Sequence, residues 1–539
     1  MMCLWLARKS VYLSKSQYIR GLQCVKSLWL LKYKSQLQQT PPQTQTARFE
    51  AGDEVGELAL QLFDCADKIS FENSTFNEKI IQTKAFIDKA MGQMQTNCAG
   101  LNSNLNTTNH KHFSSLNLDK SNPKSKNSNP TLAEATFSFD GVLVMVDILQ
   151  VTPQGLVLNE VKSATRVKDI YIDDLAVQYF VITKAGYSVA GANLVHINSA
   201  YERAGALDIN ALFCKVDLLE KVRLKQDEIK QNLQKFKRVL DDKENPPNVR
   251  IDEHCDYPYV CDFKEVCWQN ALGENSIFEL AGRKAFNPFE LYHKGVAKFG
   301  DIKDFNTFNA HQNLQIQCAI KREVHINKAA IKAFLDTLSY PIYHLDFETF
   351  SEPVPHFDTQ RPYMQVPFQY SLHIDFGNGK LAHKEFLASC DGDSRPALAQ
   401  ALVKDIPQDA CILAYNASFE RSVMKNLAEF LPEFKPNLEN FCANLKDLMT
   451  PFKNKDFYHY KMKGSYSIKA VLPALVPQME QAYHNLELIH NGGEAMDIYP
   501  KLKKMNANER KAYQSALLAY CKLDTLAMVE VLAKLKEVL

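Results

Sequence analysis

The sequence predicts an α/β protein built from two strand-rich regions with helical sequence between them. Apolar and β-branched residues dominate 137–162, and a second strand-rich region begins at 340. Between them, in 215–241, apolar residues recur at helical spacing among Lys, Gln and Glu. We therefore expect an N-terminal domain at 1–268, a helical connector at 269–339 and a C-terminal domain at 340–539.

The composition limits the class of protein. The chain has 539 residues, 46% hydrophobic and 23% charged, as expected of a globular protein with a large core. With 63 Lys and Arg against 62 Asp and Glu, the net charge is +1, which excludes a wholly basic nucleic-acid binder but permits a local basic patch. Such a patch is predicted at 1–49, where basic residues are interleaved with Trp and Tyr and no acid occurs. The alternative for this segment is an organelle transit peptide.

The cysteines and the apolar runs favour a reducing compartment. The 13 cysteines are too sparse for a disulfide scaffold, and an odd number cannot all pair. No window has the roughly 18 consecutive apolar residues that a membrane span needs. The first apolar run, at 3–7, ends at basic residues and does not resemble a secretory signal. We therefore expect a cytoplasmic protein without membrane contact, in which a few cysteines have a special role.

The N-terminal domain is predicted to contain buried strands and helices around one insertion. Strands at 137–151 and 156–162 are joined by a short turn. The segment at about 101–130 is rich in Asn and Ser and has little to bury, which predicts a disordered loop. A long amphipathic helix at 215–241 is followed by a cysteine-bearing stretch at 254–268.

The two predicted strands carry a first set of candidate catalytic residues. Asp147 lies in the first strand, and Glu160 and Lys162 are two residues apart in the second, so these two share a face. Two carboxylates can hold a divalent cation such as Mg²⁺ against a phosphate oxygen, and a lysine beside them can orient water for attack on phosphorus. Gln178 follows on a predicted helix, where a polar residue among Leu, Val and Phe needs a partner. The alternative is an ordinary ion pair on a partly exposed strand.

Over about residues 10–268 the sequence resembles the RecB-like branch of the PD-(D/E)XK nucleases. The resemblance rests on YIRGLQCVKSLWLLKY, VDIL…LNEVKSAT, the Gln178 helix and CDYPYVCDFKEVCW. It points to the four-cysteine iron–sulfur members found in CRISPR adaptation and helicase–nuclease systems. It implies a restriction-endonuclease-like fold in which Asp147 and Glu160 bind the metal and Lys162 and Gln178 complete the catalytic set.

The same resemblance implies a [4Fe–4S] cluster that fastens the two ends of the domain. Its ligands would be Cys24, Cys255, Cys261 and Cys267. The family usually has two residues between the first two late cysteines, whereas five separate Cys255 from Cys261 here, with His254 beside them as a spare ligand. The alternatives are a zinc site and buried free cysteines.

The chain departs from the family at two further positions. The metal-binding histidine of the family is replaced by Gly56, with Glu54 and Glu57 as substitutes from the same predicted helix. Ile182 stands where the family has a tyrosine, four residues after Gln178. These departures favour the C-terminal domain as the active one.

The C-terminal domain carries a second set of candidate residues on three predicted elements. These are a buried strand at 342–350, a strand at 411–420 that runs into a turn and a helix, and a helix at 518–532. An Asn-Gly pair at 378–379 predicts a hairpin turn between two further strands. The acids and the tyrosine that the three elements present are Asp346, Glu348, Glu420, Tyr520 and Asp524.

These residues follow the order D-x-E, N-x-x-F-(D), Y-x-x-x-D, which resembles the tyrosine subclass of the DEDD exonucleases of the ribonuclease-H-like fold. The resemblance covers about 340–539. It implies Asp346, Glu348 and Asp524 as ligands of Mg²⁺ or Mn²⁺ and Tyr520 as the residue that positions water, while Glu420 stands where the family has Asp. Acids from separate elements can hold two metal ions about 4 Å apart for in-line hydrolysis of phosphodiesters. The alternative is a strand end with a solvated acid pair.

Two segments of this domain could contact nucleic acid. In 464–477, Ser465 or Ser467 can cap a helix that presents Lys469 to a phosphate; the alternative is a plain capped core helix. The aromatic and basic stretch at 458–463 could stack on single strands or be an ordinary loop.

The whole chain resembles an uncharacterised bacterial family that pairs a RecB-like half with a DEDD-like half. We expect a metal-dependent nuclease, a 3′→5′ exonuclease acting on single-stranded DNA or RNA through its C-terminal site. The first alternative is a nucleic-acid-binding or assembly module that partners another enzyme. The second treats the cysteines as a zinc or redox site and the carboxylates as structural.

Overall fold

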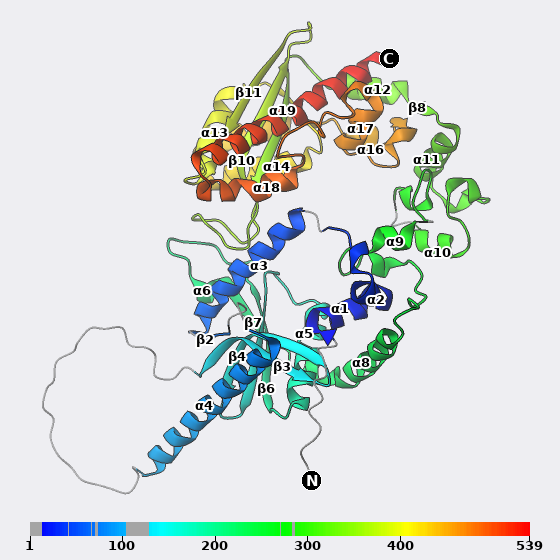
Figure 1. Cartoon of the computed structure of the whole chain (residues 1–539). Coiled ribbons are helices and arrows are strands. Elements are labelled where there is room, and N and C mark those ends of the chain that lie inside the picture. The colour runs from blue at the N-terminus through cyan, green and yellow to red at the C-terminus, as the bar shows by residue number, and fades with distance from the viewer. Residues whose placement is uncertain are drawn as a thin grey trace, which may run out of the picture. The chain divides into compact units, whose positions relative to one another are not determined.

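The computed structural model describes residues 13–40, 43–65, 67–69, 74–103, 129–269, 271–282 and 286–539. Most of the predicted Asn- and Ser-rich insertion and the first part of the predicted basic segment lie outside the described residues. The chain divides into two compact units (Figure 1). Unit 1 comprises Met1–Pro41, Arg48–Lys264 and Pro353–Pro362, and unit 2 comprises Pro42–Ala47, Glu265–Glu352 and Tyr363–Leu539. Both contain helices and β-sheet, so the predicted mixed α/β class is confirmed.

A seven-stranded mixed sheet is the framework of unit 1. Its strands are β1 (Leu13–Ser14), β2 (Asp67–Lys68), β3 (Thr131–Phe139), β4 (Val142–Thr152), β5 (Gly155–Lys162), β6 (Val189–Ile197) and β7 (Phe213–Asp217). The order is β2-β3-β4-β5-β6-β7, and β1 pairs with β4 in parallel. β4 is antiparallel to β3 and β5, β6 is parallel to β5, and β7 is antiparallel to β6. The central strands β4 and β5 are therefore adjacent, which places the predicted acids of both strands side by side.

Helices surround this sheet and complete its apolar core. They are α1 (Lys15–Gln23), α2 (Val25–Tyr33), α3 (Gln43–Leu62), α4 (Phe76–Ser103), α5 (Asp169–Lys184), α6 (Ile209–Leu212), α7 (Leu219–Leu224) and α8 (Gln226–Asp241). Leu175 and Val181 of α5 are fully buried in one apolar cluster with Leu158 of β5 and Ile229 of α8. The burial of such apolar side chains is the main favourable contribution to the free energy of folding.

The predicted strand at 137–151 is two strands, so the prediction of one continuous strand is wrong. β3 ends at Phe139 and β4 begins at Val142. Between them Asp140 has φ 47° and Gly141 has φ 81°. An Asp-Gly pair with both residues in the left-handed region is typical of a two-residue hairpin turn. The predicted hairpin between β4 and β5 is confirmed by their antiparallel pairing.

The predicted helix at 215–241 begins later and is interrupted. Residues 213–217 form β7, where polar and apolar side chains alternate with a period of two. Asp217 ends the strand, and its Oδ1 accepts a hydrogen bond of 2.9 Å from the Leu219 backbone N–H at the start of α7. Lys225 then separates α7 from α8. Pairing of β7 with β6 explains why sheet replaces the expected first helical turn.

A segment distant in sequence, Pro353–Pro362, completes unit 1. The Thr359 N–H donates to the Arg203 carbonyl at 2.8 Å, and the Arg203 N–H donates to the Gln360 carbonyl at 3.1 Å. Val354 is buried in an apolar cluster with residues of α3, β6 and β7. The segment therefore contributes both hydrogen bonds and apolar burial to unit 1.

Unit 2 has a five-stranded mixed sheet and a separate two-stranded one. The larger sheet consists of β9 (Ile342–Phe350), β10 (Val366–Asp375), β11 (Leu381–Leu387), β12 (Cys411–Ala414) and β13 (Leu445–Asp447), in the order β11-β10-β9-β12-β13. β10 is antiparallel to β9 and β11, whereas β12 is parallel to β9 and β13. The smaller sheet pairs β8 (Val324–Ile326) with β14 (Phe457–His459). The predicted strand at 342–350 and the hairpin at 378–379 are confirmed.

The helices of unit 2 flank this sheet and carry its remaining motifs. They are α10 (Pro288–His293), α11 (Ala310–Lys321), α12 (Lys328–Leu335), α13 (Ser394–Asp405), α14 (Ser418–Phe430), α15 (Lys435–Asn444), α16 (Thr450–Lys453), α17 (Ile468–Leu475), α18 (Gly492–Ile498) and α19 (Ala507–Glu537). α19 packs on β9 and β10 and contains the helix predicted at 518–532. Residues 265–352, which cover the predicted connector, are grouped with unit 2. Within the described ranges, no helix combines the length and apolar character that crossing a membrane requires.

Candidate functional site

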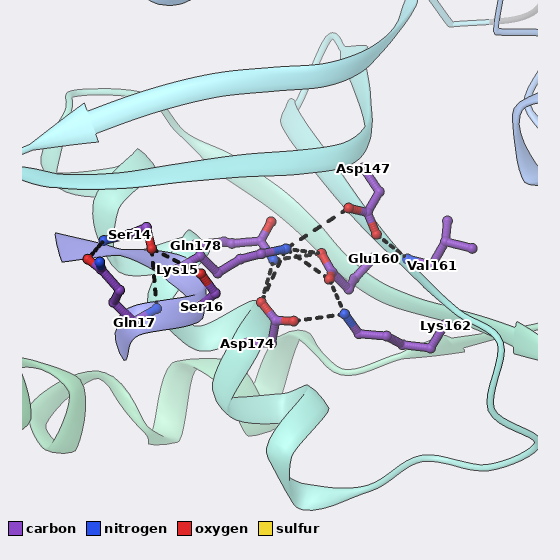
Figure 2. Close-up of polar contacts among 10 residues, drawn as sticks. All are labelled: Ser14, Lys15, Ser16, Gln17, Asp147, Glu160, Val161, Lys162, Asp174 and Gln178. Carbon is purple, nitrogen blue, oxygen red and sulfur yellow. Dashed lines mark hydrogen bonds and ion pairs between the residues drawn. The ribbon is translucent and has the colours of Figure 1, made fainter. Parts of the chain in front are cut away.

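Four of the predicted residues meet in unit 1, together with Asp174 (Figure 2). β4 supplies Asp147, β5 supplies Glu160 and Lys162, and α5 supplies Asp174 and Gln178. Lys162 Nζ donates to Glu160 Oε1 at 2.5 Å and to Asp174 Oδ2 at 2.9 Å. Gln178 Nε2 donates to Glu160 Oε2 at 2.7 Å and to Asp174 Oδ1 at 3.2 Å. The shared face predicted for Glu160 and Lys162 is thus confirmed, and the Gln178 amide nitrogen has polar partners, whereas its Oε1 is buried without one.

Sequence reasoning misses two members of this unit 1 cluster, Asp174 and Lys15. Asp174 lies four residues before Gln178 on one helix, so helical spacing alone could have placed it on the same face. Lys15 is the first residue of α1, and its Nζ is 2.9 Å from Glu160 Oε1 and 3.3 Å from Asp174 Oδ1. No local pattern marks Lys15, because its segment reaches the cluster through the pairing of β1 with β4.

Burial and charge oppose each other in the unit 1 cluster. Burial raises the pKa of Glu160, and the charges of Asp147 and Asp174 add to this effect, giving about 7 despite the two lysines. Burial would also raise the pKa of Asp174, but Lys15 and Lys162 outweigh it and lower that pKa. For the lysines, burial favours the neutral form, yet the carboxylates raise both pKa values above the usual range. Both lysines therefore stay charged at neutral pH.

The substitutes considered for the missing histidine, Glu54 and Glu57, both have exposed side chains. Glu57 of α3 forms an ion pair with Lys68 at 2.5 Å, with both side chains exposed. Glu54 is exposed on the same helix. Ile182, at the position of the family's tyrosine, is fully buried in the apolar core.

Three of the predicted cluster cysteines, Cys24, Cys255 and Cys261, lie on segments of unit 1 that hydrogen bonds hold together. Cys24 ends α1, and the Gln23 side chain next to it donates to the carbonyl groups of His254 at 2.8 Å and Tyr259 at 2.6 Å. Burial raises the pKa of Cys24, and the charges of Cys261 and Cys255 act in the same direction. None of these three cysteines forms a disulfide, and Cys267 lies in α9 (Lys264–Trp268). Thiolate donors from an early and a late segment fit an iron–sulfur cluster in kind.

In unit 2, four acids and a tyrosine line one pocket of about 220 Å³. β9 supplies Asp346 and Glu348, the first turn of α14 supplies Glu420, and α19 supplies Tyr520 and Asp524. The structure therefore brings together all five residues of the second predicted set. The other lining residues are Phe347, Tyr415, Asn416, Phe419, Ile468, Lys469 and Met528.

The turn before α14 directs Glu420 into this pocket. Asn416 follows β12 with φ 68°, in the left-handed region that Asn tolerates better than most residues. Its N–H donates to Asp447 Oδ1 at 3.0 Å, and its Oδ1 accepts from Ser418 Oγ at 2.9 Å. These bonds fix the change of direction from strand to helix, which explains the N-x-x-F spacing before Glu420.

The four acids of the pocket have no ion-pair partner among the described residues. Burial, reinforced by repulsion from neighbouring acids, raises the pKa values of Asp346 and Glu348 well above the usual range. Burial also raises the pKa of Asp524 to about 6 and that of Glu420 to about 8. Glu420 Oε2 is buried without a hydrogen-bond partner. Lys469 is the nearby cation, and its charge lowers the pKa values of Glu348 and Asp524 without offsetting burial.

Two residues of this site were outside the predicted set. The Tyr483 hydroxyl donates to Asp524 Oδ1 at 2.6 Å, and Lys469 Nζ lies 5.1 Å from the centroid of the Tyr483 ring. Cys521 Sγ is 3.5 Å from Asp346 Oδ2. Cys521 directly follows Tyr520 in the helical motif, so its position in the sequence could have indicated that it lies at the site. Tyr483 lies in irregular sequence, where no pattern indicates this.

The donor set of the pocket fits divalent cations. In the part of the chain that the structure describes, one group of three possible ligands has all its ligand atoms within 4.8 Å, and it consists of Asp346, Glu348 and Cys521. Carboxylate oxygens suit hard cations such as Mg²⁺ and Mn²⁺. The unbalanced acids and the unpartnered Glu420 oxygen would both be satisfied by such cations.

Comparisons with known proteins place this chain near uncharacterised relatives. Residues 343–467, which include Asp346, Glu348 and Glu420, match a family described as a domain of unknown function, DUF2779. An uncharacterised protein of Ureaplasma parvum is 26% identical over 249 residues, covering 42% of this chain and 34% of the relative. An uncharacterised protein of Mycoplasma genitalium is 24% identical over 217 residues, covering 36% of this chain and 32% of the relative. The chain thus spans about a third of the length of the curated relatives it matches.

Proposed function

We propose that the chain is a metal-dependent nuclease that hydrolyses phosphodiester bonds through unit 2, as a 3′→5′ exonuclease on single-stranded DNA or RNA. The observation that carries the proposal is the pocket itself. Acids from three separate elements meet a tyrosine there, and no described cation pairs with them. Two divalent ions would balance this charge.

Each residue of the pocket has a role in this proposal. Asp346, Glu348 and Asp524 hold Mg²⁺ or Mn²⁺, and Glu420 is the fourth acid. When bound, the ions supply a hydroxide nucleophile and stabilise the leaving oxygen. Burial and the nearby acids raise the pKa of Tyr520, so its hydroxyl keeps its proton and can donate a hydrogen bond that positions water. Lys469 is exposed at the pocket and can contact a phosphate.

We also propose a ribonuclease-H-like fold for unit 2 and a RecB-like, restriction-endonuclease-like fold for unit 1. Support for the first is a mixed sheet whose central strand, β9, presents Asp346 and Glu348 beside α19. The fold proposed for unit 1 is supported by the pairing of β4 with β5, which brings Asp147 of β4 next to Glu160 and Lys162 of β5. Gln178 of α5 donates a hydrogen bond to Glu160 in the same cluster. A cytoplasmic location and a [4Fe–4S] cluster belong to the same proposal.

The test is a nuclease assay with end-labelled single-stranded DNA and RNA. The wild-type chain with Mg²⁺ or Mn²⁺ should shorten a 5′-labelled strand progressively from its 3′ end, and EDTA should stop the reaction. Asp346→Ala should abolish activity, because it removes a metal ligand. Asp336→Ala, which removes an exposed acid paired with Lys332 just after α12, is the matched control and should keep full activity. Undiminished metal-dependent cleavage by Asp346→Ala would refute the assignment.

For unit 1, one observation favours the alternative of a binding or assembly module. Its acids are already paired with lysines, so the unit 1 cluster lacks the unbalanced charge of the unit 2 pocket. Lys162→Ala should therefore leave exonuclease activity unchanged in the same assay. If the wild-type chain binds nucleic acid in a salt-dependent way but cleaves none in Mn²⁺, the binding function applies to the whole chain.

A further inference from the structure

The ammonium group of Lys15 lies among all three carboxylates of the unit 1 cluster (Figure 2). Its Nζ is 2.9 Å from Glu160 Oε1, 3.3 Å from Asp174 Oδ1 and 4.0 Å from Asp147 Oδ1. A cation that bridges three acids from β4, β5 and α5 is in the position that a divalent ion would take if these acids bound one.

The backbone around Lys15 holds it there. β1 pairs with β4 immediately before it, so the chain enters α1 from the sheet itself. Ser14 and Gln17 form a capping box, in which the Gln17 N–H donates to Ser14 Oγ at 3.2 Å and the Ser14 N–H donates to Gln17 Oε1 at 3.0 Å. A lysine in the first turn of a helix is disfavoured by the helix dipole, so the three acids must compensate for its position.

The carboxylate oxygens of Glu160 and Asp174 all face nitrogen donors, whereas Gln178 Oε1 is buried without a hydrogen-bond partner. Glu160 Oε1 meets Lys15 and Lys162, and Glu160 Oε2 meets Lys15 and Gln178. Both oxygens of Asp174 are within 3.3 Å of a nitrogen, and Asp147 Oδ2 accepts from a backbone N–H at 2.7 Å. Mg²⁺ binds oxygen at about 2.0–2.1 Å and would have to displace the lysines. The unit 2 pocket is the opposite case, because its acids have no such partners in the described chain.

We propose that Lys15 is a resident cation of unit 1 that masks a latent divalent-cation site formed by Asp147, Glu160 and Asp174. The wild-type chain then binds no divalent ion at this cluster, and unit 1 contributes no metal-dependent chemistry. Removing the lysine leaves the two strand acids and the helix acid with one cation, Lys162, and a site for Mg²⁺ or Mn²⁺ opens. The inference concerns unit 1 alone and stands whether or not unit 2 is a nuclease.

The test is a titration of the full chain with Mn²⁺, in which electron paramagnetic resonance reports the free ion. Asp346→Asn and Asp524→Asn are introduced first, so that the unit 2 pocket does not contribute and its activity is not part of the readout. In this background, adding Glu160→Gln should leave Mn²⁺ binding unchanged. Lys15→Met should add one equivalent of bound Mn²⁺, with a dissociation constant at least about tenfold lower than that of any Mn²⁺ binding in the background chain. Combining Lys15→Met with Glu160→Gln should remove this added equivalent. Lys15→Arg and Lys237→Met, which removes an exposed lysine paired with Asp140, should add none.

The same titration can overturn the inference in two ways. If the background chain binds Mn²⁺ and Glu160→Gln abolishes it, the acids take metal despite Lys15. If Lys15→Met is folded by circular dichroism but binds no more Mn²⁺ than Lys15→Arg, no latent site exists. The first comparison needs no Lys15 variant, so it can overturn the inference even if Lys15→Met fails to fold.

Discussion

Raising the pH of the metal-free protein should destabilise unit 2, and deprotonation of Glu420 should account for much of the loss in its free energy of unfolding. Burial and the nearby Asp447 raise its pKa from 4.5 to about 8, and its side chain is 2% exposed. Between these two values the unfolded chain has lost the proton that the folded chain retains, so folded stability falls as pH rises. A tenfold change in proton affinity corresponds to about 1.4 kcal/mol, which makes the full loss on the order of 5 kcal/mol above pH 8. Below pH 4.5 Glu420 causes no loss of stability, because it is protonated in both the folded and the unfolded state.

Hydrogen exchange measured by mass spectrometry can test this prediction locally. In EDTA, protection of peptides from β9, corrected for intrinsic exchange rates, should fall between pH 5 and pH 8.5. Glu420→Gln should remove its share of the loss, because the amide has no proton to release. Mg²⁺ should restore protection in the wild type, by about 2.7 kcal/mol at 100 times its dissociation constant. Equal pH dependence in the wild type and Glu420→Gln would refute the reasoning.

Three further predictions follow from contacts described above. Tyr483→Phe removes a hydrogen bond to Asp524, so the pKa of Asp524 should rise above about 6. The acid limb of the pH profile of exonuclease activity should then move to higher pH. An acid limb at the same pH as in the wild type would contradict this prediction. His344 is fully buried with both ring nitrogens unpartnered and a pKa lowered to about 3 by burial, so it costs stability as pH falls from 6.5 to 3. His344→Phe should therefore unfold at lower pH in an acid titration followed by circular dichroism, whereas an unchanged midpoint would argue against it. The purified chain should contain iron and sulfide and absorb in the visible range; Cys24→Ser should lose both and Cys214→Ser neither, and zinc without iron would replace this assignment.

The sequence motifs predict the residues that local geometry brings together. Asp346 and Glu348 share a strand face because a single residue separates them, and Tyr520 and Asp524 share a helix face at i and i+4. Spacing of this kind is visible without a structure. The class of each main element could be predicted for the same reason.

What could not be predicted depends on sheet order and on loop paths. Lys15 reaches the acids only because β1 pairs with β4, a two-residue contact without a periodic signal. Tyr483 reaches Asp524 from irregular sequence before α18. The interrupted helix at 215–241 shows a different limit, because its first three residues fit either pattern and belong to β7, which pairs with β6.

Because of the segment Pro353–Pro362, the coding sequences of the two units cannot be separated by a single break in the gene. This segment is encoded between two stretches of unit 2, yet Arg203 and the apolar cluster around Val354 depend on it for their contacts in unit 1. A gene broken once after codon 264 would give neither unit whole, because the first piece would lack Pro353–Pro362 and the second would lack Pro42–Ala47. Recombination can therefore exchange these units as a pair far more easily than one at a time.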